Sequence, residues 1–238
     1  MTLEILPVEG LPEIRDGDDL GAMLAQPLRA LGIRDGDVVV VTQKIVSKAE
    51  GRLVRAADGN ERSEWIRRET RRVVARRGEL VIAETHHGFV CANAGVDASN
   101  VEPGYVSLLP VDPDLSAERI RSSLAERLGL ETLGLVVTDT FGRPWRNGLV
   151  NVAIGCAGLP AMVDLRGQAD HHGRELEMTV VALADEVAAA SGLVMGKSAW
   201  IPAALVRGLD VADAAPGRAA DLIRPPGEDL FREGTIES

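Results

Sequence analysis

The sequence predicts an α+β fold with mixed and antiparallel sheets. Segments typical of strands and of helices are interleaved along its 238 residues, without the strict alternation that a doubly wound parallel sheet requires. A composition of 45% hydrophobic and 26% charged residues is enough to bury one large core or two smaller ones. No Gly-x-Gly-x-x-Gly fingerprint and no internal repeat occurs, so a Rossmann fold is not expected.

Hydrophobic periodicity gives the expected order of elements. Strands are expected at residues 3–8, in the VVVV run after Asp37, and at 80–83, 135–137, 150–154, 161–165 and 201–206. Helices are expected at 18–31, 63–77, from Ser116 to 128, and at 170–190, with Gly192 capping the last. The strand after Asp37 is apolar on both faces, which favours a central position. Segments 150–154 and 161–165 are expected to pair with each other.

Bulk composition excludes several classes of protein. A formal net charge of −10 and 3% aromatic residues argue against nucleic-acid binding, which needs basic surfaces and stacking side chains. The two cysteines, Cys91 and Cys156, do not make a disulfide framework. Neither a basic-then-apolar leader nor an apolar run of about 18 residues is present, so no membrane partner is expected. These features favour the reducing cytoplasm.

The stretch at residues 136–148, VVTDTFGRPWRNG, is the first candidate site. A run of β-formers leads into Thr138, Asp139 and Thr140, so a buried strand is expected to end in polar ligands. A carboxylate between two hydroxyls offers the hard oxygen ligands that Mg²⁺ or Mn²⁺ prefers, and Arg143 and Arg146 could hold phosphate oxygens. A capped turn with solvated arginines is the alternative interpretation.

Polar residues also follow the predicted strand after Asp37 and the predicted strand at residues 80–83. Of 26 basic residues only Lys44, Lys48 and Lys197 are lysine, which suggests positions that need a compact ammonium. Residues 84–100 are too rich in Gly, His, Asn and Asp for a core segment and are expected to form a second wall of the site. Oxygen ligands beside basic groups would suit metal-assisted phosphoryl transfer. The candidate residues are Asp97, Asn100, Asp139, Thr140, Lys48 and Lys197, together with arginines.

Other motifs favour structural interpretations. Residues 191–198, SGLVMGKS, lack the first glycine of a P-loop and follow a predicted helix rather than a strand. The pairs His86–His87 and His171–His172 do not have the helical spacing of a zinc site. The arginines between residues 62 and 77 are expected to form a solvated face rather than a phosphate site.

Four segments resemble the coenzyme F(420)-0:L-glutamate ligase family. They are residues 42–51 (TQKIVSKAEG), 94–101 (AGVDASNV), 137–146 (VTDTFGRPWR) and 194–208 (VMGKSAWIPAALVRG), and the resemblance runs in order from residue 3 to 209. It implies two-lobed mixed α/β subunits that form a homodimer. It also implies GTP-dependent addition of L-glutamate, in γ linkage, to coenzyme F(420)-0 or its dehydro form. In that mechanism GTP converts the terminal carboxylate to an acyl phosphate, and the glutamate amine displaces phosphate.

The resemblance also implies roles for individual residues, with GTP as co-substrate, Mg²⁺ or Mn²⁺ as metal and K⁺ as a further candidate. The metal-binding positions it implies are Asp97 and Asp139 for a first ion and Thr140 for a second. The nucleotide-binding positions it implies are Leu11, Pro12, Glu13, Ile14, Thr42, Gln43, Lys48, Asn100, Met195, Gly196, Lys197, Ser198, Ala199, Trp200, Ile201 and Pro202. No general base is assigned, and Lys48 and Lys197 are candidate phosphate contacts. Lys197 departs from the archaeal-type pattern, which has a side-chain oxygen there.

The domain organisation expected from the resemblance is one ligase domain over residues 1–238, with residues 84–170 forming much of a second lobe. The composition and the tail at residues 212–238 look more like the actinobacterial version, in which a reductase-like domain follows the ligase domain, so this tail is a candidate linker to such a domain. The alternatives to this function are the same chemistry on another phosphorylated hydroxy-acid, a catalytically silent nucleotide-binding module, and a metal-dependent hydrolase.

Overall fold

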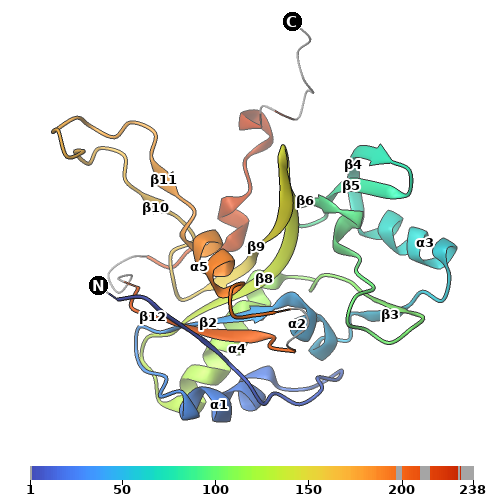
Figure 1. The fold of residues 1–238 in the computed structure, drawn as a ribbon, viewed down its shortest axis with the longest axis horizontal. Coiled ribbons are helices and arrows are strands. Elements are labelled where there is room, and N and C mark those ends of the chain that lie inside the picture. The colour runs from blue at the N-terminus through green and yellow to red at the C-terminus, as the bar shows by residue number, and fades with distance from the viewer. Residues whose placement is uncertain (1, 197–199, 210–214, 230, 232–238) are drawn as a thin grey trace, which may run out of the picture.

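The computed structural model describes residues 2–196, 200–209, 215–229 and 231, and a mixed sheet lies at its centre (Figure 1). The five strands, in spatial order, are β1 (Glu4–Pro7), β12 (Ala203–Arg207), β2 (Val38–Thr42), β8 (Gly134–Arg143) and β9 (Arg146–Ala157). The β2 and β8 strands run parallel, and the other neighbours are antiparallel. The prediction of an α+β fold with mixed sheets is therefore confirmed.

Both faces of this sheet are covered by helices. The α1 (Leu20–Ala30) and α4 (Pro113–Leu128) helices lie on one face and α5 (Leu183–Ser191) on the other (Figure 1). Alternate residues of β2 enter different cores, Val39 packing with α1 and α4 and Val40 packing with α5. Because burial on both faces needs a continuous apolar run, the predicted central position of this strand is confirmed.

A smaller part of the molecule, residues 53–108, carries its own hydrophobic core around Ile66, Val81 and Leu108. Its elements are β3 (Leu53–Arg55), α3 (Gly59–Glu69), β4 (Thr70–Arg77), β5 (Leu80–Thr85), β6 (Val90–Ala92), the 3-10 turn η1 (Asn93–Gly95) and β7 (Tyr105–Ser107). The short helix α2 (Gln43–Ala49) follows β2 directly and joins this part to the central sheet. The two-lobed division, with residues 84–170 in the second lobe, stays a prediction.

Two further segments complete the described chain. A long hairpin arm, paired through β10 (Val163–Asp164) and β11 (Val180–Val181), projects from the body in Figure 1. The C-terminal segment contains the 3-10 turns η2 (Ala219–Leu222) and η3 (Pro226–Glu228). The buried Asp114 carboxylate fixes it to β9, because it accepts hydrogen bonds from the Cys156 and Ala219 amides at 2.9 and 2.8 Å. A linker role for residues 212–238 stays a prediction.

Three predicted elements were wrong, two because non-local pairing overrides the local pattern and one because a local turn delays the start of a helix. The helix predicted at 63–77 ends at Glu69, since residues 70–77 pair with β5 as strand β4. The predicted pairing of 150–154 with 161–165 is replaced by β8–β9 and β10–β11 pairing. The helix predicted at 170–190 begins only at Leu183, because the Asp170 carboxylate and backbone close a turn with the Arg174 backbone.

Smaller corrections concern boundaries. The α4 helix begins at Pro113 with Asp112 as its N-cap, so Ser116 lies within the first turn rather than capping the helix. The strand predicted at 135–137 continues to Arg143, so Thr138, Asp139 and Thr140 lie inside β8. Gly192 is the C-cap of α5, as predicted. No helix among the described residues is long and apolar enough to cross a membrane.

The close approach of α4 to β9 leads to a stability prediction. A Cβ atom on Gly155 would lie 2.2 Å from the Pro113 carbonyl oxygen, which is backbone and cannot swing away. Gly155→Ala is expected to lower the free energy of unfolding by about 1–3 kcal/mol, measured by chemical denaturation. The control is Gly59→Ala at the start of α3, where an added Cβ meets no atom within 4 Å. Equal denaturation midpoints for the two variants would contradict this packing.

Candidate functional site

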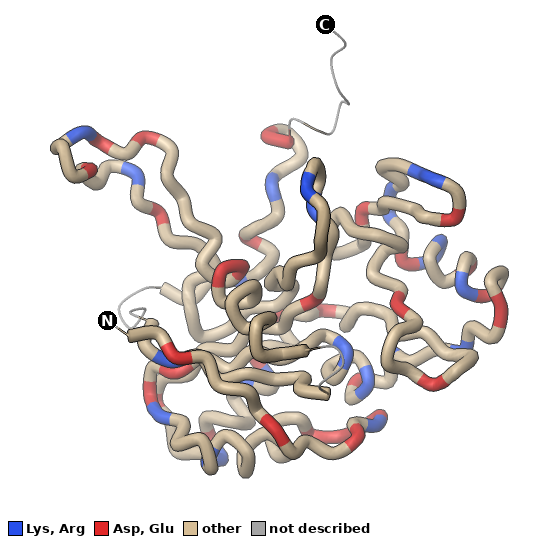
Figure 2. Tube along the Cα trace, viewed as in Figure 1, with Lys and Arg blue, Asp and Glu red and all other residues tan. Residues whose placement is uncertain are grey.

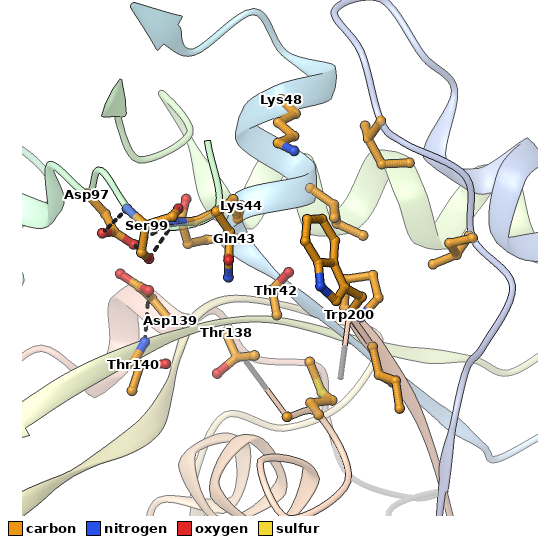
Figure 3. A pocket seen from close by; sticks show the side chains of 18 of the residues that line it. Thr42, Gln43, Lys44, Lys48, Asp97, Ser99, Thr138, Asp139, Thr140 and Trp200 are labelled. Carbon is orange, nitrogen blue, oxygen red and sulfur yellow. Dashed lines mark hydrogen bonds and ion pairs between the residues drawn. The ribbon is translucent and has the colours of Figure 1, made fainter. Parts of the chain in front are cut away.

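A cavity of about 430 Å³ opens where the parallel pairing between β2 and β8 ends (Figure 3). Thr42 and Thr138 form the last residue pair of the parallel ladder, and both line the cavity. The Thr42 amide donates to the Pro202 carbonyl at 2.8 Å, which holds residues 200–202 at the same edge. Thus segments from the start, middle and end of the chain converge on one hollow.

Every described residue for which the resemblance implied a role lines this cavity. They are Leu11, Pro12, Glu13, Ile14, Thr42, Gln43, Lys48, Asp97, Asn100, Asp139, Thr140, Met195, Gly196, Trp200, Ile201 and Pro202. The remaining three, Lys197, Ser198 and Ala199, lie outside the described residues. Convergence of these positions is a geometric finding, and their roles stay predictions.

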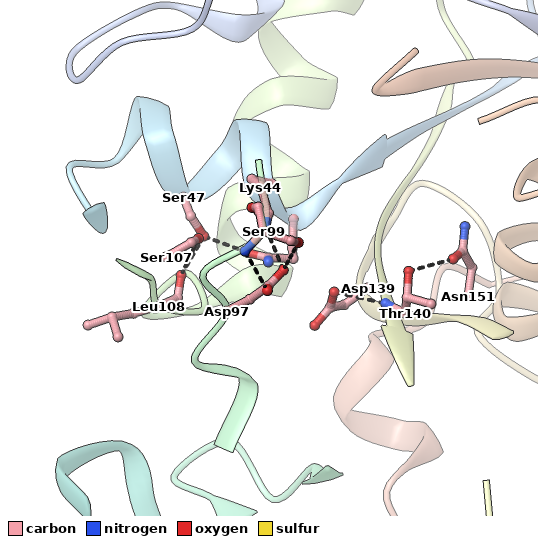
Figure 4. A network of polar contacts seen from close by, with 10 residues as sticks. Lys44, Ser47, Asp97, Ser99, Ser107, Leu108, Asp139, Thr140 and Asn151 are labelled. Carbon is pink, nitrogen blue, oxygen red and sulfur yellow. Dashed lines mark hydrogen bonds and ion pairs between the residues drawn. The ribbon is translucent and has the colours of Figure 1, made fainter. Parts of the chain in front are cut away.

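The first carboxylate, Asp139, projects from β8 toward Asp97 on the facing loop (Figure 4). Its Oδ1 accepts a hydrogen bond from the Thr140 amide at 2.8 Å, and the Thr140 hydroxyl donates to Asn151 Oδ1 at 2.9 Å. Burial, together with the Asp139 charge, raises the pKa of the nearby Cys91 thiol to about 12. Asp139 therefore presents a carboxylate to the cavity, with Thr140 held on the strand beside it.

The second carboxylate, Asp97, is held by its own loop. Its backbone pairs with Ser107, while Ser99 donates to its two oxygens, from the amide at 2.8 Å and from the hydroxyl at 2.6 Å. The preceding turn needs glycine at Gly95, where φ is +75° and a Cβ would lie 2.6 Å from the Leu109 side chain. Burial raises the pKa of Asp97, but hydrogen bonds from Lys44 and Ser99 outweigh it, so the pKa lies below its usual value.

Two lysines reach the site from successive turns of α2. The Lys44 Nζ atom lies 2.5 Å from Asp97 Oδ2 and 2.5 Å from the Ser99 carbonyl oxygen. The Lys48 Nζ atom lies 2.5 Å from Glu13 Oε1, and its side chain is only 11% exposed. The α2 helix thus supplies two ammonium groups to the cavity (Figure 3), and each of them pairs with a carboxylate.

The same helix is anchored by a buried polar pair. The Ser47 hydroxyl lies 2.8 Å from Gln43 Oε1 and 2.7 Å from the Leu108 carbonyl oxygen, and both side chains are buried. Since Leu108 belongs to the smaller core, this contact fixes the distance between α2 and the loop that carries Asp97. Gln43 therefore has a structural contact besides its place in the cavity wall.

The donor set fits a hard divalent cation. No group of three or more His, Cys, Asp or Glu side chains with metal-site spacing occurs in the part of the chain that the structure describes. Mg²⁺ is commonly held by one or two carboxylates together with substrate phosphates, which matches the pair Asp97 and Asp139. The Thr140 hydroxyl is a third oxygen on the same wall.

Several residues singled out in the sequence lie elsewhere. Arg143 and Arg146 are exposed near the tip of the β8–β9 hairpin and do not line the cavity. His86 and His87 contact backbone carbonyls of Arg68 and of residues 110 and 111, and His171 lies on the arm. Three further lining residues, Lys44, Ser99 and Asn151, were given no individual role in the sequence analysis. The rarity of lysine pointed to Lys44, and Ser99 lies in the segment expected to form the second wall, whereas nothing pointed to Asn151.

A cavity of this size, with a few converging charged groups and apolar walls, is typical of enzymes that act on small molecules. The sequence profile of the F420-0:gamma-glutamyl ligase family matches residues 10–208. Three relatives described as coenzyme F420:L-glutamate ligase align over nearly their full length. The relative from Methanothermobacter thermautotrophicus is 41% identical over 98% of this chain and 100% of its own length. The relative from Methanopyrus kandleri is 42% identical over 97% of this chain and 98% of its own length. The relative from Archaeoglobus fulgidus is 43% identical over 98% of this chain and 97% of its own length. The chain belongs to the F420-0:gamma-glutamyl ligase family, as its motifs predicted.

The two cysteines provide a test of burial around the site. Burial raises the pKa of both the Cys91 and the Cys156 thiols to about 12. Near pH 8, native protein is therefore expected to react with Ellman's reagent far more slowly than unfolded protein, whose thiols have pKa values of about 8.5. Rapid modification of either thiol in the native protein would contradict the structure around that residue.

Proposed function

We propose that this chain is a GTP-dependent ligase that joins L-glutamate, in γ linkage, to coenzyme F420-0 or its dehydro form. The observation that carries the proposal is the facing pair of carboxylates, Asp97 and Asp139, in one cavity with Lys44 and Lys48. Membership of the ligase family and the names of its relatives supply the substrates. A homodimer, a cytoplasmic location and K⁺ as an additional ion belong to the same proposal.

The reaction has to overcome the poor electrophilicity of a free carboxylate. Transfer of the γ-phosphoryl group of GTP to that carboxylate would give an acyl phosphate and GDP. The glutamate amine would then attack the carbonyl carbon, forming the C–N bond and losing a proton, while inorganic phosphate departs. A bound Mg²⁺ or Mn²⁺ would neutralise negative charge on the phosphates during this transfer.

The residues of the chain would position the reactants. Asp97 and Asp139 would hold the first ion and Thr140 would contribute to a second. Lys48, which faces Glu13 from an almost fully covered position, would contact nucleotide phosphates through its ammonium. The segments at 11–14 and 200–202 would pack against the nucleotide. Lys197 is a proposed phosphate contact, and Ser198 and Ala199 are proposed nucleotide-binding positions, although all three lie outside the described residues.

The test is incubation with GTP, MnCl₂, L-glutamate and coenzyme F420-0, following product mass and GDP together. A mass increment of one or more glutamates with matching GDP, absent when any component is left out, is the expected result. GDP without the increment would exclude this acceptor. No turnover and no increment would support a silent nucleotide-binding module instead.

Asp139→Asn tests the carboxylate pair within that assay. The substitution removes a charge without removing packing, so turnover is expected to fall by about 100-fold or more while the melting temperature stays close to the wild-type value. The matched control is Asp164→Asn on the exposed arm, where the same chemical change lies away from the cavity. Near-normal turnover by the Asp139 variant would remove this residue from the proposed metal site.

Lys44→Met tests whether the Lys44 ammonium competes with a metal ion for the Asp97 carboxylate. A cation bound at Oδ2 of Asp97 would have to share or displace Lys44 Nζ, which donates to that oxygen at 2.5 Å. The affinity for Mn²⁺, measured from the electron paramagnetic resonance signal of the free ion, is expected to rise by about tenfold.

The control for this variant is Lys48→Met, which removes the same charge from the same helix but contacts Glu13. Its effect on Mn²⁺ affinity is expected to be smaller, because no proposed ligand is released. Equal or weaker Mn²⁺ binding by Lys44→Met than by the wild type would contradict competition between the ammonium and the metal.

A further inference from the structure

A second cavity, of about 570 Å³, lies beside the β8–β9 hairpin and is not used by the nucleotide site described above. Its walls come from β4, from the turn between β5 and β6, from the hairpin, and from the segment at residues 220–226. In Figure 1 the β4, β5 and β6 strands lie next to the rising end of the hairpin. The C-terminal wall is part of the folded body, because Asp114 binds the amides of Ala219 and Ala220.

The two cavities share one face of the hairpin. Side chains alternate along a strand, so Asp139 and Phe141 project to the same face of β8, and Val152 lies opposite Asp139 on β9. Asp139 lines the first cavity, whereas Phe141 and Val152 line the second. A ligand in the second cavity could therefore extend along this face to the carboxylate pair.

One wall of the second cavity is aromatic. The rings of His87 and Phe89 stack at 5.7 Å with 24° between their planes, and Phe89 meets Phe141 edge-on at 6.3 Å. His87 Nε2 lies 2.9 Å from the Pro110 carbonyl oxygen, which can only accept, so Nε2 carries a proton and Nδ1 is an acceptor in the neutral tautomer. Among the described residues, the buried Nδ1 has no hydrogen-bond partner. This wall suits a planar ring that carries an N–H donor.

Another wall is cationic. Two guanidiniums, Arg71 and Arg72, share the buried carboxylate of Glu84 at 3.3 and 2.8 Å, so these three side chains together carry one net positive charge. Figure 2 shows basic residues along this strand, and the side chain of Arg71 is 60% exposed. Asp185, Asp229 and Arg224 line other parts of the cavity, so Arg71 and Arg72 are the two guanidiniums that come together on the β4 side. Such a wall suits one phosphate ester.

We infer that the second cavity binds the acceptor, as a planar heteroaromatic ring that carries a phosphodiester chain. This inference rests on the proposed function, whose acceptor, coenzyme F420-0, has a deazaflavin ring and a phosphodiester that ends in the reacting carboxylate. The ring lies against His87 and Phe141, the phosphodiester faces Arg71, and the chain runs along the hairpin toward Asp139. Nucleotide and acceptor thus approach the carboxylate pair from separate cavities.

The test is calorimetric titration with coenzyme F420-0 at saturating Mn²⁺ and a non-hydrolysable GTP analogue. The variant combines Phe141→Leu, which keeps an apolar side chain but removes the ring, with Arg71→Gln, which removes one exposed guanidinium. Its Kd for coenzyme F420-0 is expected to rise by about tenfold or more. The matched control is Arg76→Gln, at an exposed position of the same strand outside the cavity.

The affinity for the GTP analogue, measured in parallel, reports whether the variant is folded and is expected to stay within about twofold of the wild-type value, a difference below 0.5 kcal/mol. An acceptor Kd equal to that of the wild type would overturn the second cavity as its site while leaving the proposed function intact. Absence of acceptor binding by the wild-type protein would overturn the proposed function and this inference together. Weakening of both ligands to the same degree would also count against a separate acceptor cavity.

Discussion

The parallel register between β2 and β8 is the constraint on which the site depends. It brings Thr42 and Thr138 to the same level of the sheet, where β2 passes into α2 while β8 continues as a hairpin. Burial of alternate β2 valines in two different cores stabilises this register, because a shift by one residue would exchange the faces of the strand. The Lys44 and Lys48 ammonium groups and the Asp139 carboxylate therefore face one cavity.

A second constraint is the attachment of the smaller part to α2. The Ser47–Leu108 hydrogen bond joins this helix to the end of β7, and the Lys44–Asp97 ion pair joins it to the loop that carries Asp97. The ion pair also balances a partly buried carboxylate, whose isolated charge would be costly in that position. In our account the same contact keeps Asp97 ionised and in position, and it has to rearrange when a cation binds.

The sequence was sufficient for the sheet centre and for the convergence of the site. An apolar run such as residues 38–41 favours a central strand, and polar residues after buried strands indicated the site. The parallel pairing of β2 with β8, which brings those residues together, was not predicted. The contact between Lys44 and Asp97 could not be predicted in the same way, because it joins residues 53 positions apart through the placement of a separate core.

Local patterns failed where pairing partners were distant. Residues 70–77 have charges spaced as on a solvated helix, yet β5 offers them a strand partner. The second cavity could not be predicted from the sequence either, because its lining residues come together only in the folded chain. Arg71, His87, Phe141 and Ile223 are examples. The roles proposed for the residues in the first cavity rest on their chemistry and on the resemblance to the ligase family.

The most direct measurement is the anomalous scattering of Mn²⁺ in crystals grown with MnCl₂ and a non-hydrolysable GTP analogue. Our account predicts a peak bonded to both Asp97 and Asp139, with Lys44 Nζ moved away from Asp97 Oδ2. A peak elsewhere, or nucleotide bound with the Lys44–Asp97 pair intact and no ion between the two carboxylates, would contradict the proposed metal site.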